Sequence, residues 1–360
     1  TDLLDRFAYL RVHADVWMDR TVTAETLPET MAVAYRTPPK GRVCLVLGAG
    51  NASSIGPLDA IHKLFVEQQV VVLKLHPVMA HLAEVQAAAL APLVREGVLR
   101  VITGDHVQGA HLAGHPGVDT LHITGADRTY DAIVYGPGPE GAERRRRDEP
   151  VLHKPFSAEL GNLTPIIVVP GRWSSGDLDY HAENIATMLT NNAGFNCTTS
   201  RVIVTAAGWS QREALLDRVR RRLGQLPTRL AYYPGAAARF AAFGEVHPEA
   251  ELFGDPSDGH LPWMLIPGLS PDAAGDPCYR VEAFCSVTAE TPIDATDAVI
   301  HAWVHLDRDR ALADAGRLDA LPAAQRGSVF GLPLGVKDIV DTADLPTQLG
   351  SPVGARRRPE

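Results

Sequence analysis

Short apolar runs alternate along most of the chain with longer segments in which apolar residues recur every three or four positions. The short runs predict buried strands, and they cover residues 42–50, 70–74, 98–103, 120–124, 165–170 and 201–205. The longer segments predict helices, and they cover residues 3–18, 57–68, 80–97, 179–192 and 211–223. Because short glycine turns join these alternating elements, we expect parallel βαβ units in a doubly wound sheet. Ligands of such sheets bind at the carboxyl ends of the strands.

The pattern changes character twice in the second half of the chain. After residue 223, a stretch rich in proline, glycine and alanine predicts loops as far as about Asp276. A second change follows near Pro292. We therefore expect three parts, over residues 1–158, 159–291 and 292–360, with an α/β fold in the first two.

Composition narrows the class of protein. The 360 residues are 45% hydrophobic and carry a formal charge of −9, which gives no electrostatic reason to expect a nucleic-acid partner. The arginine run at residues 143–149 is flanked by acidic residues and predicts a solvated surface loop. No apolar run approaches the roughly 20 residues needed to cross a bilayer. The chain opens without methionine or a signal peptide, so we expect a processed or cut N-terminus.

The cysteines bear on the cellular compartment of the protein and on whether it uses a thiol nucleophile. The four cysteines form no Cys-x-x-Cys pair and no His/Cys metal spacing, which favours a reducing cytoplasm and predicts no metal site. One of them, Cys197, lies in the polar, glycine-containing stretch "NNAGFNCTTS". A lone cysteine usually packs in a core, so this placement suggests a nucleophile only if partners exist elsewhere.

Two further stretches supply such partners. "SAELGNLTP" contains Glu159, and "GAGNASSIGPL" contains Asn51 at a strand-to-helix turn. A thiolate, a carboxylate that activates water and an amide donor are the groups needed to oxidise an aldehyde through a thioester. Taken singly, a surface glutamate and a turn asparagine carry little information.

Together these stretches resemble the aldehyde dehydrogenase superfamily, and they occur in the family's order. Lys74 follows Asn51 by 23 residues, the family's spacing between its oxyanion asparagine and its cofactor lysine. "ITGAD" at residues 123–127 resembles the turn that meets the cofactor pyrophosphate at a helix N-terminus. "VEAFCSV" at residues 281–287 resembles the motif whose glutamate holds the nicotinamide ribose. The resemblance implies NAD or NADP as cofactor, bound by Lys74, Thr124, Gly125, Ala126, Leu160 and Glu282.

The resemblance also implies a fold and a mechanism. Residues 1–158 would form a Rossmann-like dinucleotide-binding domain, and residues 159–291 an incomplete α/β catalytic domain. Cys197 would attack the aldehyde carbon, with the oxyanion held by the Asn51 amide and the Cys197 backbone N–H. Glu159 would activate the water that hydrolyses the thioester. An oxyanion donor of this kind is worth about 3 kcal/mol, so loss of Asn51 should slow turnover without abolishing the fold.

Several positions depart from the family pattern. Pro77 stands where many NAD-using members carry a glutamate that grips the adenosine ribose, which leaves the choice between NAD and NADP open. Ala126 replaces a serine, and Arg201 follows the cysteine one residue sooner than the family's arginine does. The segment between Ala126 and Glu159 is longer than in the family.

The end of the chain resembles a different family. From about residue 292, "GSVFGLPLGVKDIVDTADLPTQLGSP" is similar to the N-terminal part of the amidase signature family, in which Lys337 would be the base of a Ser–Ser–Lys triad. The chain ends before the region that supplies both serines.

The strand through which aldehyde dehydrogenase subunits pair is also missing, so the sequence leaves open whether the chain forms a homo-oligomer. The alternatives are a remnant that binds dinucleotide without turnover and, less favoured, an amidase-type hydrolase. The aldehyde, the acyl acceptor (water or coenzyme A) and the origin of the fusion are not fixed by the sequence.

Overall fold

The computed structural model describes residues 18, 21–31, 33–36 and 40–294. The helix expected over residues 3–18 lies outside the described residues except for Met18, and so do Lys337 and the amidase-like segment beyond residue 294. The larger compact unit, Ala34–Val299, contains both sheets, and the short helix α2 (Leu27–Thr30) belongs to the other unit. A 3₁₀ turn, η1 (Val33–Arg36), precedes the first sheet.

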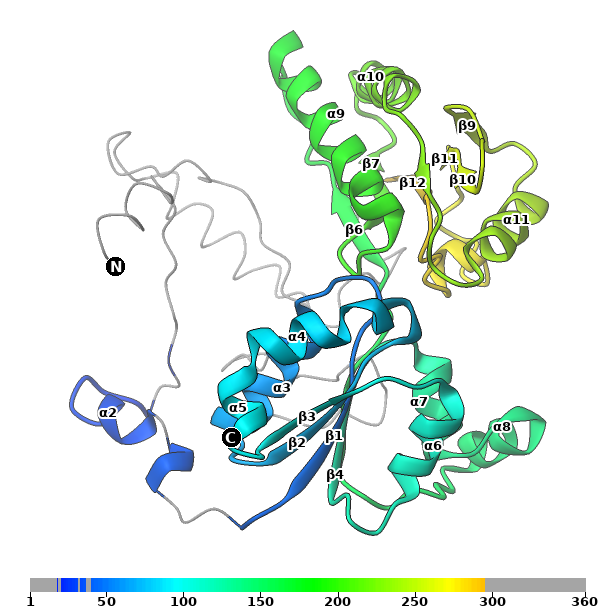
Figure 1. Ribbon diagram of the computed structural model, residues 1–360. Helices are drawn as coiled ribbons and strands as arrows, with labels where there is room; N and C mark the ends of the chain where they lie inside the picture. The colour runs from blue at the N-terminus through cyan, green and yellow to red at the C-terminus, as the bar shows by residue number, and fades with distance from the viewer. Residues whose placement is uncertain (1–17, 19–20, 32, 37–39, 295–360) are drawn as a thin grey trace. The chain divides into compact units, whose positions relative to one another are not determined.

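The first sheet is parallel and doubly wound, with the strand order β3-β2-β1-β4-β5 (Figure 1). Its strands are β1 (Val43–Leu47), β2 (Val70–Lys74), β3 (Leu99–Ile102), β4 (Thr120–Thr124) and β5 (Phe156–Glu159). The chain starts at the central strand, builds outward through β2 and β3, and returns to the other side with β4 and β5. This reversal places the carboxyl ends of β1 and β4 on either side of a topological switch point.

Both faces of the first sheet are covered by helices. Cys44 and Val46 of β1 pack on one side against α3 (Ile55–Phe65), α4 (Ala83–Ala89) and α5 (Ala91–Arg95). Leu45 and Leu47 pack on the other side against α6 (His106–Gly114) and α7 (Asp127–Val134). A strand that is buried on both faces reads as a continuous apolar run, which is why the sequence predicts it well.

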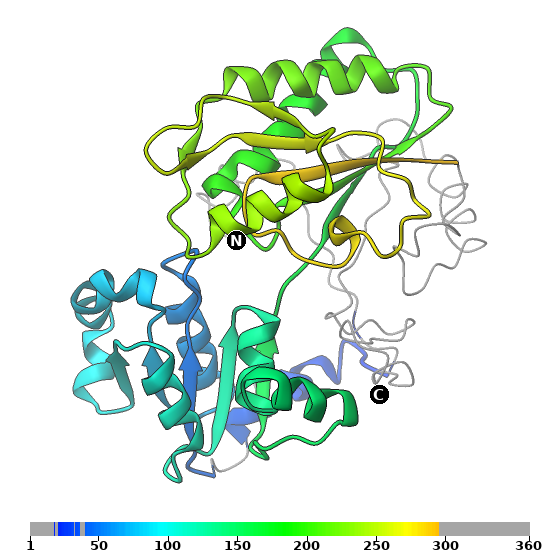
Figure 2. The same ribbon diagram turned by 90° about the vertical axis from the view of Figure 1, so that its right-hand side faces the viewer.

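The second sheet has the order β6-β7-β12-β11-β9, and only β9 runs antiparallel to its neighbour (Figure 2). Its strands are β6 (Thr164–Ile167), β7 (Ser200–Ala206), β9 (Glu251–Phe253), β11 (Trp263–Ile266) and β12 (Val287–Ile293). Trp263 and Leu265 face α9 (Ser175–Thr190) and α10 (Arg212–Gln225), while Met264 and Ile266 face α11 (Ala236–Val246). A separate two-stranded ribbon pairs β8 (Arg229–Leu230) with β10 (His260–Leu261).

The α/β class with parallel sheets is therefore confirmed, whereas the predicted domain limits stay predictions. Residues 160–163 connect β5 of the first sheet to β6 of the second. The predicted single helix at residues 80–97 is wrong, because the chain forms the 3₁₀ turn η2 (Pro77–Leu82), then α4, then α5. The break falls at Leu90, since Pro92 lacks an N–H and its ring clashes with the carbonyl four residues earlier.

The expectation of loops between residue 223 and Asp276 is also wrong. That stretch contains α11 and the strands β8 to β11. Gly235, with a φ of +77°, sets the turn before α11, and the alanines that follow it are the strongest helix formers. A composition typical of flexible loops thus supports a helix between tight turns.

The arginine run forms a helix and not the expected loop. It lies in α8 (Gly138–Arg147), where Arg147 pairs with Glu143 one turn earlier and Arg145 pairs with Asp131 at 3.0 Å. The first pair, at a spacing of four residues, supports an exposed helix, and the second joins α8 to α7. No helix among the described residues is both long and apolar enough to cross a bilayer.

Candidate functional site

The loop that carries Cys197 joins α9 to β7 and has an unusual backbone. Asn192, Ala193 and Gly194 of the 3₁₀ turn η3 (Asn191–Gly194) all have positive φ angles, of 49°, 55° and 79°. A Cβ on Gly194 would lie 2.4 Å from the Cys285 carbonyl oxygen, so the loop admits only glycine there. Positive φ at alanine is sparsely populated and costs on the order of 1 kcal/mol, which surrounding packing must offset.

Phe195 supplies that packing. Its side chain is fully buried and contacts the rings of Tyr232, Tyr233 and Phe284. Two residues later the side chain of Cys197 is only partly buried. The loop is thus held by a buried aromatic anchor immediately before the predicted nucleophile.

The segment after β5 is hydrogen-bonded directly to the nucleophile loop. The Cys197 carbonyl oxygen accepts hydrogen bonds from Asn162 Nδ2 and Thr164 Oγ1, both at 3.1 Å. Asn162 belongs to the same "ELGN" stretch as Glu159, the predicted general base, which ends β5. The Glu159 carbonyl accepts from the Gly125 N–H at 3.0 Å. Two of the predicted stretches therefore meet through backbone and amide contacts.

The turn after β1 also reaches the nucleophile loop. Asn51 Nδ2 donates to the Phe195 carbonyl oxygen at 2.8 Å, and Asn192 Nδ2 donates to the Asn51 carbonyl at 2.8 Å. Tyr232 donates its hydroxyl proton to the same Asn51 carbonyl at 3.1 Å. A carboxamide nitrogen carries two protons, and the bond to Phe195 engages one of them. The role of Asn51 as oxyanion donor stays a prediction.

His76 and Tyr233 are contacts of this site that sequence reasoning missed. Their rings stack with centroids 5.3 Å apart, and Tyr233 Oη lies 3.3 Å from His76 Nε2. His76 Nδ1 accepts the Val78 N–H, so Nε2 carries the ring proton and donates to Tyr233. Burial, with a smaller contribution from the Lys74 charge, lowers the pKa of His76. A Cβ on Gly50 would lie 2.4 Å from the imidazole, so Gly50 makes room for this stack.

Several residues predicted to bind cofactor lie at the carboxyl ends of β2 and β4. Lys74 ends β2 with its side chain buried, and burial lowers its pKa while the Asp105 charge partly opposes this shift. Thr124 ends β4 and donates to Asp59 Oδ2 at 2.9 Å. Gly125 follows it, and Ala126 is the N-cap residue of α7. Leu160 follows the next strand, β5, and packs against the hydrophobic cluster that contains Leu45 and Leu47 of β1.

Glu282, the predicted ribose ligand, lies against the "ELGN" stretch. Its Oε2 atom would be 2.9 Å from a Cβ on Gly161, so the missing side chain there leaves room for the carboxylate. Arg201, buried at the start of β7, donates to the carbonyls of Gly194 at 2.7 Å and Cys285 at 2.6 Å. This arginine ties the nucleophile loop to the segment that carries Glu282. Burial lowers its pKa to about 10, which leaves it charged at neutral pH.

An open groove of about 730 Å³ runs beside these contacts. Its polar lining includes Asn51, Asn192, Asn196 and Tyr232, and residues 78–82 contribute most of its apolar lining. Cys197 is not among the lining residues, so the groove lies next to the nucleophile loop and does not by itself identify the reacting sulfur. The segments that carry the expected carboxylate and amide each contact the nucleophile loop, and the individual roles of the three groups stay predictions.

The sequence profile of the aldehyde dehydrogenase family matches residues 2–231, well over half of the chain. The chain belongs to the aldehyde dehydrogenase family. A second profile, that of the amidase family, matches residues 287–360. The resemblance to both families, in this order along the chain, is thereby confirmed.

Curated relatives match each part of this aldehyde dehydrogenase family member separately. N-succinylglutamate 5-semialdehyde dehydrogenase of Ectopseudomonas mendocina (strain ymp) is 32% identical over 131 residues, which are 36% of this chain and 23% of that protein. Aminoaldehyde dehydrogenase 2, peroxisomal, of Malus domestica is 35% identical over 132 residues, or 35% and 23% of the two chains. A glutamyl-tRNA(Gln) amidotransferase chain of Koribacter versatilis (strain Ellin345) is 42% identical over 97 residues, or 25% and 20%. The matches span about a quarter or less of each relative.

Solved structures of aldehyde dehydrogenases share the fold. The Mycobacterium tuberculosis aldehyde dehydrogenase complexed with NAD+ has a TM-score of 0.57 at 20% identity, covering 73% of this chain and 55% of that chain. The NADP-dependent glyceraldehyde-3-phosphate dehydrogenase of Bacillus halodurans C-125 complexed with NADP has a TM-score of 0.55 at 18% identity, covering 76% and 58%. The chain therefore spans between half and two thirds of these structures.

The thiols of this aldehyde dehydrogenase family member should differ in reactivity. Burial raises the pKa of Cys44 and Cys278, and it raises the pKa of Cys285 to about 11. Because the thiolate is the reactive form, we expect iodoacetamide at neutral pH to label Cys197 at least about tenfold faster than the three buried thiols. Peptide mass spectrometry after timed quenching measures each rate. Equal labelling of Cys285 and Cys197 would contradict the expectation.

Proposed function

We propose that this chain binds NAD or NADP and oxidises an aldehyde, with Cys197 as the nucleophile. The observation that carries the proposal is the double attachment of the nucleophile loop. Asn51 bonds to it from the first sheet, and Asn162, three residues after Glu159, bonds to it through the Cys197 carbonyl. The contacts bring the segments that carry Asn51 and Glu159, which are distant from Cys197 in the sequence, against the nucleophile loop, and this supports the proposal.

The proposed roles follow from the chemistry of each side chain. The Cys197 thiolate forms a bond to the aldehyde carbon, and the carbonyl oxygen becomes an oxyanion. The Asn51 amide and the Cys197 N–H stabilise that negative charge by hydrogen bonding. The tetrahedral adduct then loses the hydride from the aldehyde carbon and becomes a thioester. Glu159 takes a proton from water, which attacks the thioester, releases the acid and restores the thiol.

The residues proposed to hold the dinucleotide suit an anionic, hydroxyl-rich ligand. When bound, the dinucleotide supplies the hydride acceptor. Lys74 contributes a cation at the end of β2, and Gly125 and Ala126 precede the N-terminus of α7, where backbone N–H groups favour a phosphate. Gly161 leaves space for the Glu282 carboxylate, a group suited to ribose hydroxyls. Since Pro77 places no carboxylate after β2, both NAD and NADP are compatible with the site.

A direct assay tests this proposal. We expect NADH or NADPH absorbance at 340 nm to rise when the 360-residue chain is mixed with dinucleotide and a panel of small, amino- and carboxyl-bearing aldehydes. Dinucleotide binding is measured in parallel by isothermal calorimetry. Turnover supports the proposal, and binding without turnover on any aldehyde would favour the non-catalytic alternative. Absence of both would overturn it.

A further inference from the structure

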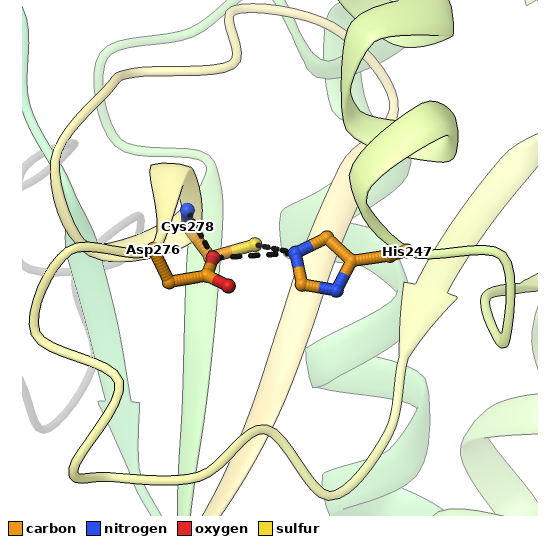
Figure 3. Close-up of side chains that lie close together, drawn as sticks. All are labelled: His247, Asp276 and Cys278. Atoms are coloured by element: carbon orange, nitrogen blue, oxygen red, sulfur yellow. Dashed lines mark hydrogen bonds and ion pairs between the residues drawn. The ribbon is translucent and has the colours of Figure 1, made fainter.

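Three side chains with metal-binding chemistry converge at the C-terminal end of α11, and none of them has a role in the proposed aldehyde chemistry. His247 is the residue at the C-terminal end of α11, and Asp276 and Cys278 lie in and beside the 3₁₀ turn η4 (Pro277–Tyr279). Figure 3 shows all three side chains pointing toward one another. His247 Nε2 lies 3.2 Å from Asp276 Oδ1 and 3.7 Å from Cys278 Sγ.

These separations match those between the ligands of a tetrahedral zinc ion. With bond lengths of about 2.0 Å to nitrogen and oxygen and about 2.3 Å to sulfur, tetrahedral angles place nitrogen about 3.3 Å from oxygen and about 3.5 Å from sulfur. All three potential ligand atoms lie within 4.8 Å of one another. A single ion could therefore contact all three atoms with only small side-chain adjustments.

The environment of the three side chains also resembles that of metal ligands. His247 and Cys278 are each only 4% exposed, so the two softer ligands are withdrawn from solvent. The second ring nitrogen, His247 Nδ1, lies 2.9 Å from Glu249 Oε1. A carboxylate at that position fixes the tautomer in which Nε2 has its lone pair available for a metal. Asp276 is itself oriented, because its Oδ1 accepts the Cys278 N–H at 2.8 Å.

We propose that His247, Asp276 and Cys278 form a binding site for Zn²⁺ or a chemically similar divalent cation. The described residues supply three ligands of mixed N, O and S type, and water completes the fourth position. Such a donor set selects zinc over magnesium or calcium, which prefer oxygen ligands alone. The ion would join the end of α11 to the segment that leads into Glu282, and so hold that segment in place. None of the three ligands takes part in the proposed aldehyde chemistry, so the site can be tested without it.

Without an ion, the same groups would be an ordinary hydrogen-bonded cluster of the core, and Co²⁺ distinguishes the two cases. We expect tag-free, chelator-treated protein to bind one Co²⁺ with a thiolate-to-metal charge-transfer band in the near ultraviolet and tetrahedral d–d bands in the visible. Zn²⁺ should displace the Co²⁺ and abolish both bands. The readout requires no dehydrogenase activity.

Substitutions test which residues bind the Co²⁺ ion. Cys278→Ser should lose the charge-transfer band, and Asp276→Asn should weaken Co²⁺ binding at least about tenfold, as loss of a metal-bound carboxylate typically does. Cys197→Ala and Cys44→Ala are the matched controls and should keep the band. Far-ultraviolet circular dichroism checks that each variant is folded. If the wild type gives no charge-transfer band, or if the band survives in Cys278→Ser and disappears in Cys197→Ala, the proposed site is wrong.

Discussion

Replacing Cys197 with alanine is expected to eliminate aldehyde-dependent NAD(P)H formation while the dinucleotide still binds. Removing a nucleophile that acts together with its partners typically costs on the order of 10⁴-fold or more in turnover. The fold should be retained, because alanine keeps the backbone carbonyl that accepts hydrogen bonds from Asn162 and Thr164. Phe195, the buried anchor of the loop, is also unchanged. The measurement is the initial rate at 340 nm on the best substrate of the wild type.

Cys44→Ala is the control for this experiment. Cys44 lies buried in β1, in the core between the sheet and its helices, and has no place in the proposed reaction. Its replacement should leave the rate within a few-fold of the wild type. If Cys197→Ala retained a comparable rate, another group would have to be the nucleophile and the proposed chemistry would be wrong.

The largest expected effect on stability comes from Arg212→Met. Arg212 of α10 binds Glu290 of β12 with two hydrogen bonds, Nε to Oε1 at 2.9 Å and Nη2 to Oε2 at 2.7 Å. The Glu290 side chain is fully buried and also accepts from Thr205 and the Gly268 N–H. Methionine would leave that carboxylate buried without its cation, at a cost of about 3–5 kcal/mol in the free energy of unfolding. Urea denaturation followed by circular dichroism measures the change.

Arg218→Met, on the same helix, is the matched control. Arg218 is about as exposed as Arg212 and pairs with Asp179 at 2.9 Å, but the Asp179 side chain is half exposed, whereas Glu290 is inaccessible. Water can therefore replace the lost cation at Asp179, and the expected loss is below about 1 kcal/mol. A similar loss in both variants would show that burial of the partner carboxylate does not determine the cost.

The sequence predicts well those elements that can be recognised from the local pattern of apolar residues alone. The β1 strand is almost entirely buried and β2 mostly so, and their continuous apolar runs identify them without knowledge of their neighbours. Local chemistry also explains the errors. A proline at position 92 interrupts an otherwise regular helical pattern, and glycine and alanine near α11 suggest a loop where a helix is favoured.

Sequence alone determined the family and the likeness of the chain's end to a second family, and it supplied the candidates for thiol, carboxylate and amide chemistry. It did so because motif residues within one turn or strand keep a fixed spacing, whatever the rest of the fold does. Only the tertiary structure decided that Asn51 contacts the loop of Cys197, and that His247 meets Cys278. Such contacts depend on strand order and helix packing. These bring together residues that are far apart in the sequence, and sequence separation does not predict distance in space.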